Sequence, residues 1–209
     1  RDATTSKVYV SQLKVGSDIG RCICGNFTNN VPGCVGFAYG NPVSTVANKA
    51  SAELSAPGVA YNFNIYWDGD LLSETFNYVA GKNTEGGIYK YGQSGPIYTC
   101  QGSLTNNDTK GTPCYQGDIL GDWREEIIMR TADNNIRIYS TPTPTEHRNY
   151  NLWFDHQYRN AMVWQMCGYN QPPHVSYFMG ELEGITIAPP PLTTTGRKVV
   201  ANGGTIGSS

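Results

Sequence analysis

Short apolar runs, each broken by a polar turn, constrain the fold of this chain more than any other feature. Gly, Asn, Pro and Asp fill the segments between the runs, and apolar residues almost never recur at the spacing of an α-helix. The runs that we predict to be β-strands are residues 7–10, 34–39, 62–67, 86–91, 125–130, 135–140, 160–165 and 174–180. Many short strands predict an all-β fold, either a sandwich or a β-propeller.

A weak internal repeat favours the propeller. Three segments, residues 25–37, 67–76 and 117–128, each place Asp or Asn early and lead to a strand that ends in an aromatic residue. Repeats of about 40–50 residues are typical of propeller blades, so the chain has room for about three to four of them. Closed propellers usually need about four to eight blades. We therefore predict that residues 1–192 form part of a propeller, completed by blades from the same or another chain, and that residues 193–209 form a linker or a disordered tail.

The composition argues against several classes of function. The chain carries 15 Lys and Arg against 17 Asp and Glu, so it lacks the basic excess with which proteins bind nucleic acid. No apolar run approaches the roughly 18–20 residues that span a bilayer, so no membrane partner is predicted. The six cysteines contain no CxxC pair, which argues against a structural zinc site.

The even number of cysteines fits an oxidising compartment. Cys100 and Cys114 flank a polar loop and could close it as a disulfide, and Cys22 or Cys24 could pair with Cys34 in the same way. The alternative is that several cysteines are small buried apolar residues. The sequence leaves both readings open.

Two acidic turns in matching repeat positions predict calcium sites. Oxygen-only clusters suit Ca²⁺, which takes about six to eight oxygen ligands, and carboxylates this close repel one another unless a cation lies among them. The alternative is a hydrated turn in which Asp bonds the local backbone. The predicted metal ligands are Asp68, Asp70 and Glu74 in one turn and Asp118, Asp122 and Glu126 in the other.

Two further segments have side chains that suit a sugar. The polar loop of residues 103–114 would offer a binding edge on a rigid β scaffold; otherwise it is a surface excursion. In residues 167–178, two prolines fix the backbone beside Tyr169 and Asn170. An aromatic ring can stack on a sugar and an amide can bond its hydroxyls, so Asn170 is a predicted substrate contact; the alternative is a structural corner.

The motifs YWDGDLLSE, TNNDTKGTPC, GDILGDWREEII, IRIYSTPTPTEHRNYNL and YNQPPHVSYFMG occur in one succession over most of residues 18–180. At these motifs the sequence resembles the rhamnogalacturonan lyases of polysaccharide lyase family 11. The resemblance implies a secreted, calcium-binding, eight-bladed β-propeller roughly three times this length, of which this chain matches the C-terminal part.

The resemblance also implies an activity, the β-elimination of rhamnogalacturonan I, the rhamnose–galacturonate backbone of pectin. A base removes the proton from C5 of galacturonate and the bond at C4 breaks, while cations neutralise the adjacent carboxylate. Arg21, Lys110 and Tyr169 match cleft residues of the family, and Asn107 and Thr109 match substrate contacts. Either Lys110 or Tyr169 would be the base, and the sequence does not decide between them.

This chain departs from the family at Asp108 and around Cys22–Thr28, where the Gly and metal-binding Asp residues that the resemblance implies are replaced. Asp108 replaces a glycine, which puts an acid beside an anionic substrate. The blades that supply the rest of the family's cleft are also missing from this chain. These differences keep a second hypothesis open, namely a non-catalytic module that binds pectin or another glycan.

Overall fold

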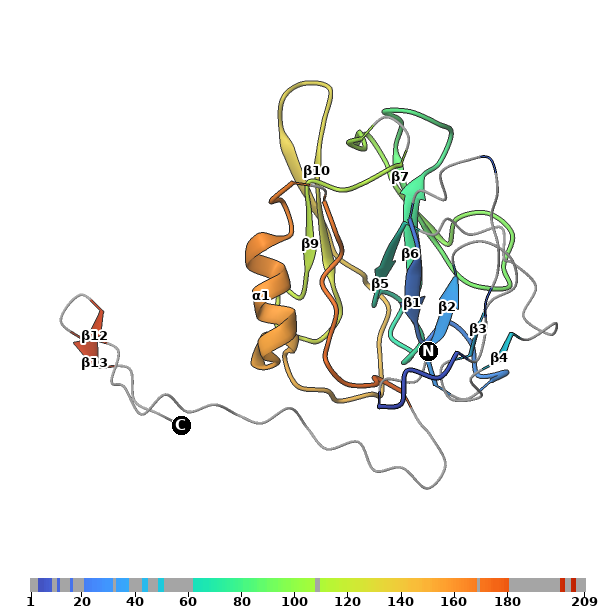
Figure 1. The fold of residues 1–209 in the computed structure, drawn as a ribbon. Helices are drawn as coiled ribbons and strands as arrows, with labels where there is room; N and C mark the ends of the chain where they lie inside the picture. Colours follow the sequence, from blue (N-terminus) through green and yellow to red (C-terminus); the bar gives the residue numbers. More distant parts are fainter. Residues whose placement is uncertain are drawn as a thin grey trace.

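The computed structural model describes residues 4–8, 11, 16, 21–31, 33–37, 43–44, 49–50, 62–107, 110–168, 170–180, 200–201 and 204–205. The described part is built mainly from antiparallel sheets with one α-helix (Figure 1), so the predicted all-β class is confirmed. Among these residues, no helix has both the length and the apolar character needed to cross a membrane.

Two sheets have four strands each, in simple up-and-down order. The first contains β1 (Ile23–Gly25), β2 (Val35–Phe37), β3 (Val43–Ser44) and β4 (Lys49–Ala50). The second contains β5 (Phe63–Ile65), β6 (Glu74–Tyr78), β7 (Gly86–Tyr89) and β8 (Tyr98–Cys100).

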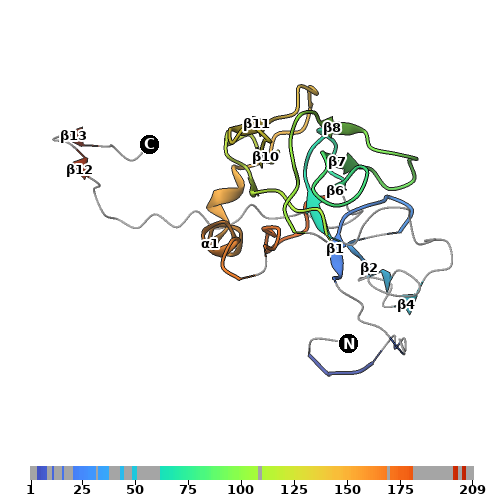
Figure 2. The ribbon, with the colours of Figure 1, turned by 90° about the horizontal axis from the view of Figure 1, so that it is seen from above.

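A three-stranded sheet follows, in which β10 (Glu126–Arg130) lies between β9 (Tyr115–Gly117) and β11 (Ile136–Tyr139). A 3-10 helix, η1 (Leu152–Phe154), leads into α1 (His156–Trp164). Seen from above, the three sheets follow one another in chain order, with α1 beside the third (Figure 2). A hairpin of β12 (Val200–Ala201) and β13 (Gly204–Thr205) lies within the predicted tail, whose boundary at residue 192 falls outside the described residues.

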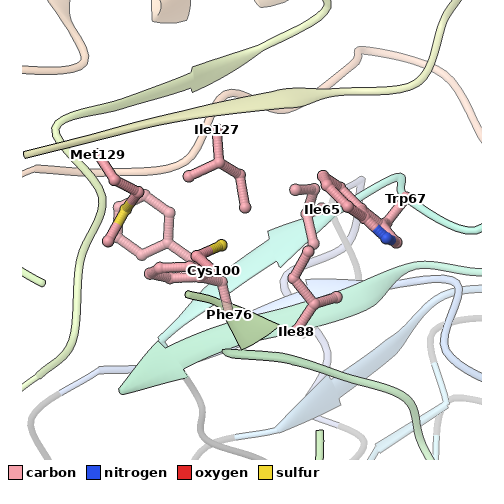
Figure 3. Packing of buried hydrophobic residues seen from close by; sticks show 8 residues of the cluster. Ile65, Trp67, Phe76, Ile88, Cys100, Ile127 and Met129 are labelled. Atoms are coloured by element: carbon pink, nitrogen blue, oxygen red, sulfur yellow. The ribbon is translucent and has the colours of Figure 1, made fainter. Parts of the chain in front are cut away.

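The main core lies between the second and third sheets (Figure 3). Its members share complete or nearly complete burial: Phe63, Ile65, Trp67, Phe76, Ile88, Cys100, Ile127 and Met129. Packing is tight enough to require glycine at position 86, because a Cβ there would lie 2.5 Å from the Phe76 ring. Cys100 is part of this core and none of the six cysteines forms a disulfide, so the predicted Cys100–Cys114 bridge is absent and the apolar alternative holds for Cys100.

The strand predicted at residues 160–165 is wrong, because these residues belong to α1 and the turn after it. Asp155 caps the helix by accepting a hydrogen bond from the backbone N–H of Tyr158, which satisfies a donor that the first turn leaves unpaired. Tyr158, Ala161, Met162 and Gln165 are buried. Their spacing is that of one helix face, and it was the signal in the sequence that we missed.

The strand predicted at residues 174–180 is also wrong, since the structure has no strand there. Asp155 bonds this segment instead: its carboxylate accepts the backbone N–H of Ser176 at 2.6 Å and the hydroxyl of Ser176 at 2.7 Å. The two prolines just before it have no N–H to give to a sheet ladder. Of the strand predicted at residues 7–10, Lys7 and Val8 are not in a strand, and the rest lies outside the described residues.

Candidate substrate cavity

A narrow-necked loop between β8 and β9 forms one side of the candidate site. Asn106 and Thr112 exchange backbone hydrogen bonds of 2.8 and 3.0 Å across the neck. The guanidinium of Arg130 donates to Asn106 Oδ1 at 2.8 Å and fixes the neck to β10. Asn107 begins the loop with a φ of +62°, a conformation that non-glycine residues seldom adopt outside constrained turns.

Two asparagine side chains clamp the far end of this loop at Gly111. Asn62 donates to the carbonyl of Gly111, and the N–H of Gly111 donates to Asn77 Oδ1 at 2.9 Å. A Cβ on Gly111 would lie 2.2 Å from the backbone nitrogen of Tyr78, so only glycine fits between the loop and β6. The clamp fixes the backbone directly beside the half-buried Lys110.

The segment that follows α1 forms the other side of the site. Gln165 exchanges two hydrogen bonds with the backbone of Gln116 in β9, at 2.9 and 2.7 Å, and so fixes the end of the helix to the sheet. Five residues on, Asn170 Nδ2 donates to the carbonyl of Pro113 at 2.7 Å. Arg21 Nη1 donates to the carbonyl of Asn170 at 2.6 Å, while its guanidinium lies 5.6 Å from the centre of the Phe63 ring.

Between these two sides lies a cavity of about 400 Å³. Its lining residues are Asn106, Asn107, Thr112, Met166, Gly168 and Asn170. Asn170 is 8% exposed, and its Oδ1 atom is buried without a hydrogen-bond donor among the described residues. A buried acceptor of this kind is costly to leave unpaired, and with almost no accessible surface it belongs to the scaffold behind the cavity wall.

The structure brings only part of the predicted site together. Asn107 and Asn170 line one cavity, and Arg21 reaches it through the backbone of Asn170. Arg21 and Lys110 are not among the lining residues, although the N–H of Lys110 donates to the carbonyl of Asn107 at 3.3 Å. Thr109 and Tyr169 lie outside the described residues.

Sequence reasoning missed the lining residues Met166 and Gly168 and the asparagine clamp. Met166 and Gly168 belong to the turn after α1. Because the sequence predicts a strand at residues 160–165 in place of this helix, it does not predict the turn. Asn62 and Asn77 meet Gly111 across separations of 49 and 34 residues. No local motif marks such contacts, because each depends on the packing of β5 and β6 beneath the loop.

The first acidic turn already contains a cation. Asp68, Asp70 and Glu74 offer ligand atoms within 4.8 Å of one another, the one such group of three found among the described residues. Lys90 Nζ forms ion pairs with all three, at 2.6 Å from Asp70 Oδ2, at 3.1 Å from Glu74 Oε1 and closer still to Asp68 Oδ2. An ammonium and a Ca²⁺ ion cannot share this position, so the group fits Ca²⁺ only if Lys90 leaves it.

Burial sets the electrostatics of this turn. Desolvation raises the pKa of Glu74 to about 8 despite the opposing effect of Lys90. Burial acts to lower the pKa of Lys90, but the three carboxylates raise it by more. Glu74 is fully buried and also accepts the backbone N–H groups of Trp67 and Asp68.

The second acidic turn repeats this backbone arrangement but does not gather its carboxylates. Glu126 Oε2 accepts the N–H groups of Ile119 and Leu120 at 2.8 and 2.9 Å, as Glu74 does in the first turn. Asp118 Oδ2 instead accepts the N–H of Leu152, and Asp122 pairs with Arg124. The two turns therefore share a backbone arrangement, as the repeat in the sequence predicts. Calcium at Asp118, Asp122 and Glu126 stays a prediction.

Next to this turn, Glu125 lies in a buried polar network between the sheets and α1. Its carboxyl group accepts hydrogen bonds from the backbone N–H of Tyr66 at 3.0 Å, from Gln116 Nε2 at 3.1 Å and from the hydroxyl of Tyr158 at 2.7 Å. Burial nevertheless raises the pKa of Glu125 to about 8. The network ties α1 to β9, which positions the turn that lines the cavity.

Comparison with known proteins identifies the family of this chain. The family model described as "Rhamnogalacturonan lyase family 11, C-terminal domain" matches residues 1–191. The chain belongs to this family, which confirms the resemblance seen in its motifs.

Two curated relatives come from Bacillus subtilis (strain 168). The chain is 40% identical over 182 residues to "Rhamnogalacturonan endolyase YesW", a match that covers 87% of this chain and 28% of that protein. It is 36% identical over 201 residues to "Rhamnogalacturonan exolyase YesX", covering 86% of this chain and 31% of that protein. The chain thus spans less than a third of the length of either relative.

Solved structures agree with this assignment. The crystal structure of rhamnogalacturonan lyase YesW superposes with a TM-score of 0.76 at 40% identity, over 93% of this chain and 32% of that one. The structure titled "Bacillus licheniformis Rhamnogalacturonan Lyase PL11" gives a TM-score of 0.70 at 37% identity, over 83% of this chain and 29% of that one.

Proposed function

We propose that this chain forms one side of the substrate cleft of a rhamnogalacturonan lyase. The observation that carries the proposal is the amide-lined cavity, with Asn106 and Asn107 on the loop side and Asn170 on the other side, in a member of lyase family 11. Amide groups both donate and accept hydrogen bonds, which suits the hydroxyl groups of a sugar. Met166 adds an apolar surface for the sugar's C–H face.

In the proposed reaction a base removes the proton on C5 of galacturonate. The electrons of that C–H bond form a double bond between C4 and C5, and the C4–O bond breaks with departure of the neighbouring sugar. The C5 proton becomes acidic enough only when cations neutralise the adjacent carboxylate. Arg21, held at the cavity wall by Asn170, and Lys110, held beside the Asn62–Asn77 clamp, are the proposed cations.

The proposed base is either Lys110 or Tyr169, and the sequence does not decide between them. We assign no step of this chemistry to the two acidic turns, where Lys90 pairs with Glu74 and Arg124 pairs with Asp122, and calcium at these turns stays a prediction. We further infer that the three sheets are blades of a propeller in a secreted protein, with the remaining blades supplied by the same or another chain. The up-and-down strand order and the repeated Glu74 and Glu126 turns support this inference.

Binding of rhamnogalacturonan oligosaccharides to this chain, measured by calorimetry, tests the proposal. We expect Asn107→Ala and Asn170→Ala to weaken binding about tenfold, the worth of one or two hydrogen bonds. Asn160→Ala, on the exposed face of α1, is the matched control and should bind as the parent does. Absence of binding by the parent chain would refute the proposed cleft.

An assay with the same oligosaccharides distinguishes the lyase hypothesis from the hypothesis of a non-catalytic glycan-binding module. Binding without release of an unsaturated product, even in a protein that contains a complete set of blades, would favour the module. The acid at Asp108 is the feature of the sequence that favours that outcome. Ultraviolet absorbance of the unsaturated uronate is the direct readout of elimination.

A further inference from the structure

Cys24 and Cys34 share the outer face of the β1–β2 hairpin. Along β1, Ile23 and Gly25 are buried whereas Cys24 is exposed, and along β2 the buried residues are Val35 and Phe37. Because side chains alternate between the two faces of a strand, a residue directly before Val35 points away from the core. Cys34 occupies that position, on the same side as Cys24.

The register of the hairpin makes Cys24 and Cys34 diagonal neighbours on one face. Cys24 lies directly opposite Gly36 in the ladder, and because Gly36 has no side chain, Cys24 can lean toward Cys34, its diagonal neighbour. The two thiols are hydrogen-bonded to each other. β1 and β2 run side by side in Figure 1.

We propose that Cys24 and Cys34 form a reversible disulfide that closes the end of this hairpin. The bridge would enclose Phe27, which packs against Phe37 at 5.5 Å between ring centres, and Asn26. The carbonyl of Asn26 accepts the N–H of Ser73 at 2.6 Å, which ties the hairpin end to the second sheet. Oxidation or reduction of this cysteine pair would therefore act on the segment that joins the first sheet to the second.

The hydrogen bond assigns different roles to the two sulfurs. Donation from the Cys34 thiol lowers the pKa of Cys24 and raises that of Cys34. Since the thiolate is the nucleophile, Cys24 attacks first. With oxidised glutathione as oxidant, the Cys24 thiolate displaces one glutathione thiolate and forms a mixed disulfide. Cys34 then loses its proton to solvent and attacks the Cys24 sulfur, which releases the second glutathione: two thiols are oxidised and one disulfide is reduced.

The main competitor is Cys22, which is also exposed and precedes Cys24 by two residues. The test incubates the folded chain with oxidised glutathione and then alkylates the remaining thiols. Trypsin followed by chymotrypsin separates Cys22 and Cys24 from Cys34 by cleavage after Phe27, and fragmentation in a mass spectrometer locates the bridge. Reduction with dithiothreitol provides the reference sample.

We expect one intramolecular bridge, between Cys24 and Cys34, that dithiothreitol removes. Cys22→Ser should keep this bridge, whereas Cys24→Ser and Cys34→Ser should lose it and retain a glutathione adduct at most. Fragmentation of the parent chain gives the answer even if a variant fails to fold. A bridge from Cys22 to Cys34, or glutathione adducts without any bridge in the parent chain, would overturn the proposal.

Discussion

Replacing Lys90 with methionine tests whether this lysine is the cation that holds the first acidic turn together. Methionine keeps most of the length and the apolar stem of the side chain but removes the charge. Lys90 has a side chain only 12% exposed, and its partner Glu74 is fully buried. The variant leaves that carboxyl group in a low-dielectric site without its counter-ion.

The magnitude depends on pH, because Glu74 can escape the penalty by binding a proton. Breaking a buried ion pair costs about 3–5 kcal/mol when the remaining charge stays buried. With the pKa of Glu74 at about 8, the parent chain ionises this group near pH 8.5, so there we expect a loss of about 3 kcal/mol in the free energy of unfolding. At pH 5 the carboxyl is protonated in both chains, and only the more exposed pairs with Asp68 and Asp70 are lost, at about 1 kcal/mol.

Urea unfolding of the parent chain and of Lys90→Met at both pH values measures this difference. In a chain of this size, about 3 kcal/mol corresponds to a fall of roughly 6–12 °C in Tm. The exposed Lys82, changed to methionine, is the matched control and should shift stability by less than about 0.5 kcal/mol. Equal losses for Lys90→Met at pH 5 and pH 8.5, or no loss at either, would refute the reasoning.

Three other predictions follow from the buried groups. Lys90→Met should also bind Ca²⁺ or Tb³⁺ at the vacated position, with terbium luminescence sensitised by nearby Trp67; terbium binding of equal strength by the parent chain would contradict the role given to Lys90. Because burial raises the folded-state pKa of Glu125 to about 8, the unfolded chain loses this proton first, so the stability that this group contributes is complete below about pH 4.5 and is lost as the pH rises through 8, by up to about 5 kcal/mol. Glu125→Gln should flatten that fall, and a parent chain that gains stability over this range would argue against the assignment. Gly111→Ala should displace the loop from Tyr78 and abolish oligosaccharide binding, and calorimetry showing unchanged affinity would mean that the loop is not part of the cleft.

Local patterns were sufficient to predict much of the sheet structure. The runs at residues 62–67 and 125–130 contain β5 and β10, because short runs rich in apolar residues and bounded by turns fit strands that are largely buried. The helix was missed because its buried face, Tyr158 to Gln165, is short and carries polar as well as apolar side chains. Asp155 was the local signal, since it begins the helix as an N-cap.

The site was less predictable, because its contacts join residues far apart in the chain. Asn107 and Asn170 stood out as polar groups in constrained segments, and both line the cavity. The carboxylates Asp68 and Asp70 suggested a metal, yet their cation is Lys90, which follows β7 and lies 22 and 20 residues away. A cluster of carboxylates in the sequence predicts a cation nearby, but it does not show which residue or ion that cation is.

The central claim is that the loop between β8 and β9, which carries Lys110, takes part in rhamnogalacturonan elimination. The most direct measurement replaces the matching segment of the Bacillus subtilis endolyase YesW with this chain and follows ultraviolet absorbance of the unsaturated product from rhamnogalacturonan I. The account predicts turnover by this chimera and a loss of at least about a hundredfold on Lys110→Ala, while Lys82→Ala leaves the rate unchanged. A chimera whose Lys110→Ala form cleaves as fast as its parent would contradict it.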